Sequence, residues 1–189
     1  MALPVPADLD QYPGALVAAA CAEFGTEHVV EWCAALLAGR AAPDDPERPS
    51  LYWIGGRPAA GTLRTGRTTG PDLSHWPRVW AARALRYAWT PAAAPAVVGA
   101  LADPSWRVRE TAARVAALRE LPETVDLLAA LTTDQVPRVR AAALHGLGTL
   151  GEGEHAEPLR AALDDPAPAV ATAAAKALRT LCHRLDRDL

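Results

Sequence analysis

Residues 130–150 read ALTTDQVPRVRAAALHGLGTL, and the same arrangement returns at residues 100–118 (ALADPSWRVRETAARVAAL) and 161–181 (AALDDPAPAVATAAAKALRTL). The aspartates Asp103, Asp134 and Asp165 lie 31 residues apart. The same interval separates the valines and the alanines that follow them, namely Val108, Val139 and Val170, and Ala112, Ala143 and Ala174. Self-similarity at a fixed interval of this length is the signature of a repeat architecture.

The spacing of apolar residues predicts that each of these stretches contains a helix. Val139, Ala143, Leu147 and Leu150 stand at i, i+4, i+8 and i+11, which places them on one stripe of an α-helix. The third stretch repeats this stripe with Val170, Ala174, Leu178 and Leu181. Pro137 is expected just inside its helix, where a missing backbone N–H costs little, and the preceding Asp-containing turn ends the helix before it.

A second, shorter helical series precedes these helices. Its members contain Val98, Leu128 and Leu159 and begin near Pro95, Pro122 and Glu154. Each unit is therefore expected to be helix, turn, helix, and no single pair buries its apolar stripe alone, so the units must stack. The sequence predicts an all-α fold, an α-solenoid of about four helical hairpins with an N-terminal helical cap.

Three segments are expected along the chain. Residues 1–40 predict a pair of helices, broken at Phe24-Gly25-Thr26, that caps the stack. Residues 41–73 form a Pro/Gly-rich loop that contains LYWIGG at 51–56, and a connection of this length is usually functional or disordered. Residues 74–189 hold the repeats, of which the first, HWPRVWAARALRYAW at 75–89, is degenerate.

The repeat pattern of a leucine-closed helix, an Asp with a nearby Pro, Val-Arg and an alanine-rich helix resembles bacterial HEAT-like repeats, including those named after phycobilisome lyases. The resemblance covers residue 74 to about residue 185. It implies a ladder between neighbouring repeats, built from the turn aspartates Asp103 and Asp134 and the arginines Arg109 and Arg140. Ala171 and Trp80 replace the arginine in the last and first units, so the ladder is expected to be incomplete at both ends.

Composition limits the possible environments and chemistries. A net charge of −3 and a pI near 5.9 give no global electrostatic reason to bind nucleic acid or anionic membranes. Three cysteines without zinc spacing favour reducing cytosol, and the N-terminus lacks a signal-peptide pattern, so a cytoplasmic location is expected. No metal motif, nucleotide loop or catalytic motif is present, so no metal, cofactor or catalytic residue is predicted.

The equivalent positions of the second helices suggest a binding surface. Arg114, His145 and Lys176 are spaced by the repeat interval, and Arg107 and Arg138 form a parallel pair whose third member is Ala169. Such positions could line the concave face of a stack, where tryptophans also serve as anchors. The predicted binding residues are Trp80, Trp106, Arg107, Arg114, Arg138, His145 and Lys176. An ordinary solvated helix face explains the same charges, and core packing explains the tryptophans.

Three functions remain open from the sequence. The first is a non-catalytic scaffold that binds an acidic protein or peptide on the concave face. The second is a nucleic-acid-binding protein, because alkylpurine DNA glycosylases resemble HEAT stacks with Trp and Arg on that face. The third, resembling the bilin-lyase branch, is a small-molecule-binding protein or enzyme whose pocket lies between the N-terminal helices, the Trp53 loop and Trp76, Trp80 and Trp89.

Overall fold

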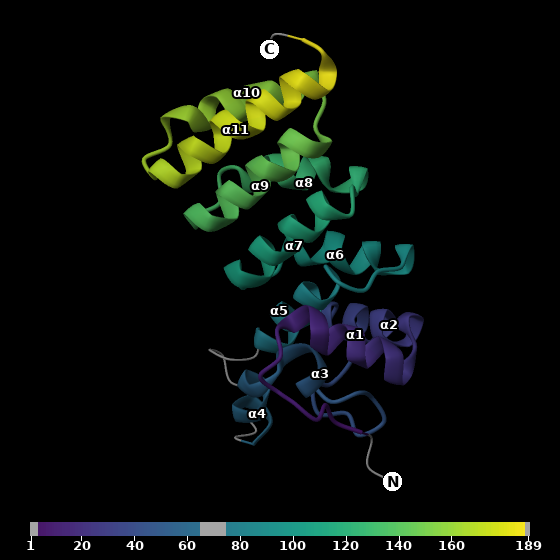
Figure 1. Ribbon diagram of the computed structural model, residues 1–189. Helices are drawn as coiled ribbons and strands as arrows, with labels where there is room; N and C mark the ends of the chain where they lie inside the picture. Colours follow the sequence, from purple (N-terminus) through teal and green to yellow (C-terminus); the bar gives the residue numbers. More distant parts are fainter. Residues whose placement is uncertain (1–3, 65–74, 188–189) are drawn as a thin grey trace. The chain divides into compact units, whose positions relative to one another are not determined.

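The computed structural model of the chain describes residues 4–64 and 75–187. Within these residues every regular element is a helix and no strand occurs (Figure 1). The prediction of an all-α fold of stacked helices is therefore confirmed. The chain forms two compact units, unit 1 of residues 1–100 and unit 2 of residues 101–189.

Unit 1 opens with two antiparallel helices joined at a single glycine. Helix α1 (Pro13–Phe24) ends and α2 (Thr26–Leu37) begins at Gly25, whose φ of 86° lies in the region that favours glycine. The remaining elements of unit 1 are α3 (Tyr52–Gly55), α4 (Arg57–Arg64), α5 (Trp76–Ala84), the 3₁₀ turn η1 (Pro91–Ala93) and α6 (Ala94–Ala100). Helix α2 packs against α1, α5 and α6, and its Trp32 is fully buried among them.

The segment expected as a loop, residues 41–73, contains two short helices. Helix α3 forms because Leu51, Trp53 and Ile54 all turn into the core, so the aromatic fragment is an anchor of unit 1. The indole N–H of Trp53 donates to the carbonyl of Pro4 at 3.0 Å, and Arg83 of α5 donates to the carbonyl of Ile54 at 2.8 Å. The expected boundary between residues 73 and 74 lies outside the described residues.

Unit 2 alternates short first helices with long second helices. The second helices are α7 (Trp106–Leu118), α9 (Pro137–Leu150) and α11 (Pro168–Leu185). The first helices are α8 (Val125–Leu131) and α10 (Ala156–Ala161), preceded by the 3₁₀ turns η2 (Pro122–Thr124) and η3 (Gly153–His155), and η4 (Ala162–Asp164) follows α10. Helix α9 packs between α7 and α11, while α8 packs on α9 and α10 on α11 (Figure 1).

Positions separated by the repeat interval share the same environment in unit 2. Val108, Val139 and Val170 are fully buried, one in each second helix. The alanines that follow them one turn later, Ala112, Ala143 and Ala174, are fully buried as well. The 31-residue recurrence therefore marks structurally equivalent positions.

Bidentate ion pairs join each repeat of unit 2 to the next. Arg109 of α7 donates to both carboxylate oxygens of Asp134 at 2.8 and 3.1 Å, and Arg140 of α9 donates to both of Asp165 at 2.7 and 2.8 Å. Each arginine also donates to the backbone carbonyl of its own repeat's aspartate, Asp103 or Asp134, at 2.8 Å. Such paired charge-assisted bonds fix orientation as well as energy.

The aspartates of this ladder also hold the turns before the second helices. Oδ1 of Asp103, Asp134 and Asp165 accepts the backbone N–H two residues later at 2.8 Å in each repeat. The Arg140 guanidinium, helped by the Ala167 N–H, keeps the pKa of Asp165 below its ordinary value despite partial desolvation. Asp134 and Asp165 therefore each stabilise their own turn and bind the arginine of the preceding repeat.

Small residues bring the second helices close together. A Cβ placed on Gly148 would lie 2.8 Å from both the Cα and the carbonyl oxygen of Ala177 in α11. Backbone atoms cannot turn away as a side-chain tip does, so α9 and α11 approach over a glycine.

We predict that Gly148→Ala destabilises the protein by about 1–3 kcal/mol, because the added methyl group must push α11 away from α9. Chemical denaturation followed by circular dichroism measures this loss. The matched control is Gly99→Ala in α6, where an added Cβ meets open space. The control should stabilise by about 0.5–1 kcal/mol through helix propensity, and equal effects of the two changes would contradict close packing at Gly148.

We predict that Arg140→Ala lowers the free energy of unfolding by about 2–3 kcal/mol at pH 7, because it leaves Asp165 without its bidentate partner. Arg160→Ala, which removes an exposed i,i+3 pair with Glu157, should change it by less than about 1 kcal/mol.

The same ion pair gives this loss a defined pH dependence. The folded pKa of Asp165 is lowered, so the contribution is present above its ordinary pKa and disappears as the pH falls through the folded value. The difference between wild type and Arg140→Ala should therefore shrink below about pH 4. A difference that stays constant down to the acid transition would show that the pair does not stabilise unit 2.

Candidate functional site

The second helices of unit 2 carry almost only positive charge. Their basic residues are Arg107, Arg109 and Arg114 on α7, Arg138 and Arg140 on α9, and Lys176, Arg179 and Arg184 on α11. Glu110 is the single carboxylate on these three helices, and it is buried. Because Arg109 and Arg140 are held in the ladder, the remaining basic side chains supply the charge of the exposed face.

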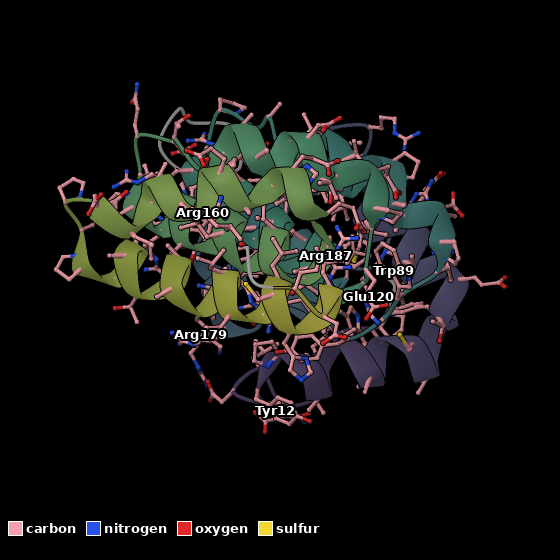
Figure 2. The ribbon with its side chains drawn as sticks, turned by 90° about the horizontal axis from the view of Figure 1, so that it is seen from above. Tyr12, Trp89, Glu120, Arg160, Arg179 and Arg187 are labelled. Carbon is pink, nitrogen blue, oxygen red and sulfur yellow. The ribbon has the colours of Figure 1, made fainter. Side chains whose placement is uncertain are left out.

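Negative charge gathers instead on the first helices and their turns. Its exposed members are Glu123, Asp126, Glu154, Glu157 and Asp164, in η2, α8, η3, α10 and η4. Figure 2 labels one exposed arginine on each layer, Arg160 from α10 and Arg179 from α11. Arg160 lies beside Glu157 at 3.5 Å, whereas the sequence of α11 contains no acidic residue. Unit 2 therefore has one acidic layer and one basic layer.

Trp106 begins α7 and lies under two guanidinium groups. The guanidinium carbon of Arg107 is 4.4 Å from the centre of the indole ring, and that of Arg138, from α9, is 5.6 Å away. Both distances are within cation–π range. The half-buried indole therefore interacts with two of the protein's own cations, one from its own helix and one from α9.

The buried carboxylate of Glu110 binds two arginines near Trp106. Glu110 is only 7% exposed, and its Oε1 accepts hydrogen bonds from Arg114 at 3.0 Å and from Arg138 at 3.3 Å. Arg138 also comes within 3.2 Å of it through Nη2. The side chains of Arg114 and Arg138 remain 50% and 68% exposed. Glu110 therefore positions two exposed cations, and we call Trp106, Arg107, Glu110 and Arg138 the Trp106 cluster.

A row of equivalent side chains crosses the three second helices beside this cluster. Arg114, His145 and Lys176 are exposed on α7, α9 and α11, and we call them the cation column. Partial burial, then the charges of Lys176 and Arg114, lower the pKa of His145 below its ordinary value. Arg114 and Lys176 therefore each lie within electrostatic reach of His145, which is mainly neutral at pH 7.

The basic surface continues along α11 past the cation column. A shallow depression of about 630 Å³ is lined by Lys176, Arg179, Thr180, His183 and Arg184. Arg184 approaches Glu152 at 3.6 Å, while no acidic side chain lines the depression itself. This lining is suited to anions and offers no apolar wall.

Trp80, for which the sequence left both a binding role and core packing open, lies in the core. It is 4% exposed in the core of unit 1, stacks on Trp76 with ring centres 6.0 Å apart, and rests against Gly55 of α3. Gly55 admits the ring because any Cβ there would lie 2.8 Å from it. Burial of an indole in this way stabilises the core and removes Trp80 from any binding surface.

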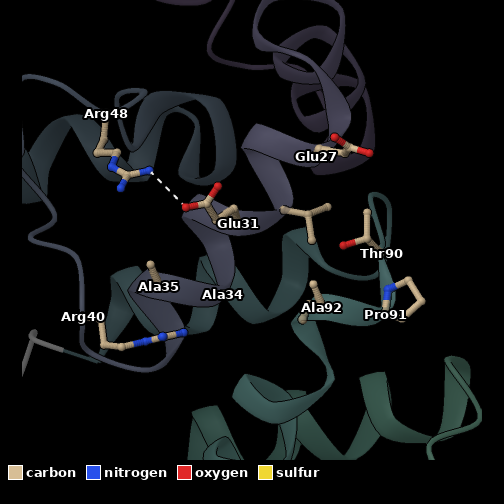
Figure 3. Close-up of a pocket in the computed structure, with 11 residues that line it drawn as sticks. Glu27, Glu31, Ala34, Ala35, Arg40, Arg48, Thr90, Pro91 and Ala92 are labelled. Atoms are coloured by element: carbon tan, nitrogen blue, oxygen red, sulfur yellow. Dashed lines mark ion pairs between the residues drawn. The ribbon is translucent and has the colours of Figure 1, made fainter.

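A pocket in unit 1 combines charged and small apolar side chains and has no aromatic wall. It measures about 710 Å³, and Glu27, Glu31, Arg40, Arg48 and Thr90 supply its polar lining, with Glu31 and Arg48 4.0 Å apart (Figure 3). No tryptophan lines it, and Trp53, the centre of the expected aromatic pocket, is 5% exposed and packs edge-on against Phe24. Trp53 and Trp80 are thus core residues of unit 1.

Potential metal ligands do not cluster in the described part of the chain. Residues 4–64 and 75–187 contain no group of three or more His, Cys, Asp or Glu side chains placed to hold a metal ion. Cys21, Cys33 and Cys182 are free, and burial, then the nearby Cys21, raises the pKa of Cys33, so this thiol stays protonated. Over the same residues, no helix combines the length and the apolar character needed to cross a bilayer.

Comparison with known families assigns the repeats. The family model of HEAT repeats matches residues 71–147 and again residues 124–188. The chain belongs to the HEAT-repeat family. No curated protein matches it. HEAT repeats generally serve as protein-interaction scaffolds, and in this HEAT protein the second helices of unit 2 carry the exposed basic face.

Sequence reasoning missed Glu110 and the role of Asp165. A signal for Glu110 was present, because it is the only carboxylate on a second helix and Arg114 follows it at i+4. Its contact with Arg138 depends on how α7 and α9 pack, which the sequence does not state. Asp165 completes the ladder with Arg140, as Asp134 does with Arg109.

We predict that His145 makes stability fall at mildly acidic pH. Its folded pKa is lowered, so its contribution is complete above about pH 6.5 and is lost as the pH falls through the folded value, where the unfolded chain takes up the proton more readily. His145→Gln should therefore show a smaller drop in melting temperature between pH 7.5 and pH 5 than wild type.

The control for this measurement is His28→Gln, at an exposed position of α2 in unit 1. Lys176→Gln supplies an independent check, since removing the neighbouring charge should raise the pKa of His145 in an NMR titration. An unchanged pKa in Lys176→Gln would show that the cation column is not a row of interacting groups.

Proposed function

We propose that this HEAT protein is a non-catalytic scaffold that binds an acidic protein segment on the basic face of unit 2. The observation that carries the proposal is the separation of charge between the two helical layers, which leaves Arg107, Arg114, Arg138 and Lys176 on a face with no exposed carboxylate from its own helices. A face of one sign attracts and orients a partner of the other sign.

The Trp106 cluster supports a binding role over a merely solvated face. Arg114 and Arg138 are fixed by a buried acceptor, so they lose less side-chain freedom on binding than free surface arginines do. Trp106 adds an aromatic anchor of the kind that dominates interface energetics. In this proposal the predicted residues Trp106, Arg107, Arg114, Arg138, His145 and Lys176 contact the partner, and Trp80 does not.

Binding of nucleic acid is the second candidate. The same arginines could neutralise phosphates, and Trp106 could stack on a base. The guanidinium groups of Arg107 and Arg138 over the indole ring compete with such stacking, and the chain as a whole is acidic. These features favour a protein that binds other proteins over a glycosylase-like enzyme. The cytoplasmic location and bacterial source expected from the sequence remain part of the proposal.

The lyase-like alternative receives less support. It requires an aromatic pocket for a flat ligand, whereas the pocket of unit 1 is lined by charged and small side chains (Figure 3). Of the rings expected around that pocket, Trp53 and Trp80 are buried in the core, whereas Trp76 and Trp89 are half-buried.

We predict that affinity capture from the native host, with nuclease treatment, recovers acidic proteins that Arg138→Gln/Lys176→Gln loses by roughly tenfold, since two exposed ion pairs are removed. Quantitative mass spectrometry of the captured proteins measures the change. The matched control is Arg86→Gln/Arg160→Gln, which removes the same charge from exposed positions outside the basic face.

Two outcomes would contradict the proposal. If both double variants capture the same proteins as wild type, the basic face is not the binding surface. If capture depends on nucleic acid, and single-stranded DNA binds with a steep salt dependence that Arg138→Gln/Lys176→Gln abolishes, the nucleic-acid alternative replaces it.

A further inference from the structure

The positive side chains of unit 2 form a grid with a defined spacing. Along α7, Arg107 and Arg114 are seven residues apart, which is about 10 Å on a helix that rises 1.5 Å per residue. Across the layer, the cation column steps from α7 to α9 to α11, and packed helices lie about 8–10 Å apart. The contact between Gly148 and Ala177 sets α9 and α11 at a close approach.

The equivalence of the column positions places one member of the column on each second helix. Arg114, His145 and Lys176 occupy the same place in three successive repeats, and the valines that set their helices, Val108 and Val139, are equally buried. The charges of Arg114 and Lys176 both act on His145, which lies between them. A partner that follows the column therefore meets a side chain that can donate a hydrogen bond to a carboxylate about every 8–10 Å, a cation at Arg114 and Lys176 and an imidazole N–H at His145.

Different peptide conformations present acidic groups at different intervals. Polyproline II has three residues per turn and rises about 3.1 Å per residue, so every third side chain lies on one face about 9 Å from the next. A β-strand presents every second side chain on one face, at about 6–7 Å or twice that distance, and neither interval fits the column.

A helical partner fits the spacing but not the chemistry of the face. Amphipathic helices dock through an apolar stripe in an apolar groove. Among the described residues of unit 2, the large apolar side chains that are exposed are Leu118, Leu127 and Leu163, and only Leu118 is on a second helix, at its last residue. The depression beside the column on α11 is lined by basic and hydroxyl side chains alone.

We infer that the partner segment is an acidic polyproline II stretch with a carboxylate at every third residue, lying across α7, α9 and α11 along Arg114, His145 and Lys176. This inference rests on the proposed binding of an acidic segment by the basic face. The prolines of such a segment pre-set its conformation, so it loses little entropy on binding, which suits a shallow surface that gains affinity mainly from charge.

The test compares two fluorescein-labelled peptides of equal length and composition by fluorescence anisotropy at pH 7.5. One repeats Glu-Pro-Pro, and the other gathers its glutamates at the two ends of a proline run. We expect the repeating peptide to bind roughly fivefold to tenfold more tightly, because only its glutamates are spaced like the side chains of the cation column. Arg114→Gln and Lys176→Gln should each reduce this preference, while Arg86→Gln should leave it unchanged.

His145→Arg provides a gain of function, because it places a permanent charge at the middle position of the cation column, where the wild-type histidine is mainly neutral at this pH. It should strengthen binding of the repeating peptide several-fold and that of the clustered peptide much less. Far-ultraviolet circular dichroism of the variants confirms that the helices remain folded.

The possible results distinguish a failure of the inferred spacing from a failure of the proposed function. Equal binding of the two peptides, reduced alike by Lys176→Gln, would overturn the spacing and leave the basic face as a binding surface. Binding of neither peptide, or binding that no change on the basic face affects, would overturn both. Tighter binding of the clustered peptide would also overturn the inferred conformation.

Discussion

The bidentate bond from an arginine of one repeat to the turn aspartate of the next is the interaction on which unit 2 depends. Arg109 with Asp134 and Arg140 with Asp165 repeat the same geometry, so each second helix is set at the same height relative to its neighbour. Small residues at the interface, such as Gly148 against Ala177, then allow the helices to pack closely. Regular rows of surface residues follow from this fixed register.

Fixed register also divides the arginines into two classes. Those one residue after the buried valines, Arg109 and Arg140, are used within the ladder, while Arg107 and Arg138, one residue before them, reach the surface beside Trp106. Glu110 of α7 accepts hydrogen bonds from both Arg138 of α9 and Arg114 of α7. The basic face is thus built from residues whose orientation the repeat itself determines.

The sequence predicted the helices that recur in each repeat better than it predicted features that occur only once. Periodicity identified the second helices, because matched positions share an environment, and the family resemblance supplied the ladder residues except Asp165. It could not decide the fate of Trp80, since an indole is equally suited to a core and an interface, and burial against Gly55 depends on where α3 packs. For the same reason residues 41–73 were expected as a loop, although Leu51 and Ile54 anchor the short helix α3 there.

The two oppositely charged layers of unit 2 give it an electric dipole moment roughly perpendicular to its helices, even though its positive and negative charges nearly cancel. A charged partner at a distance therefore experiences a torque as well as an attraction, and the unit turns its α7, α9 and α11 side toward an approaching polyanion before contact. A protein with an acidic isoelectric point can in this way meet an acidic partner productively, with repulsion directed at the opposite layer.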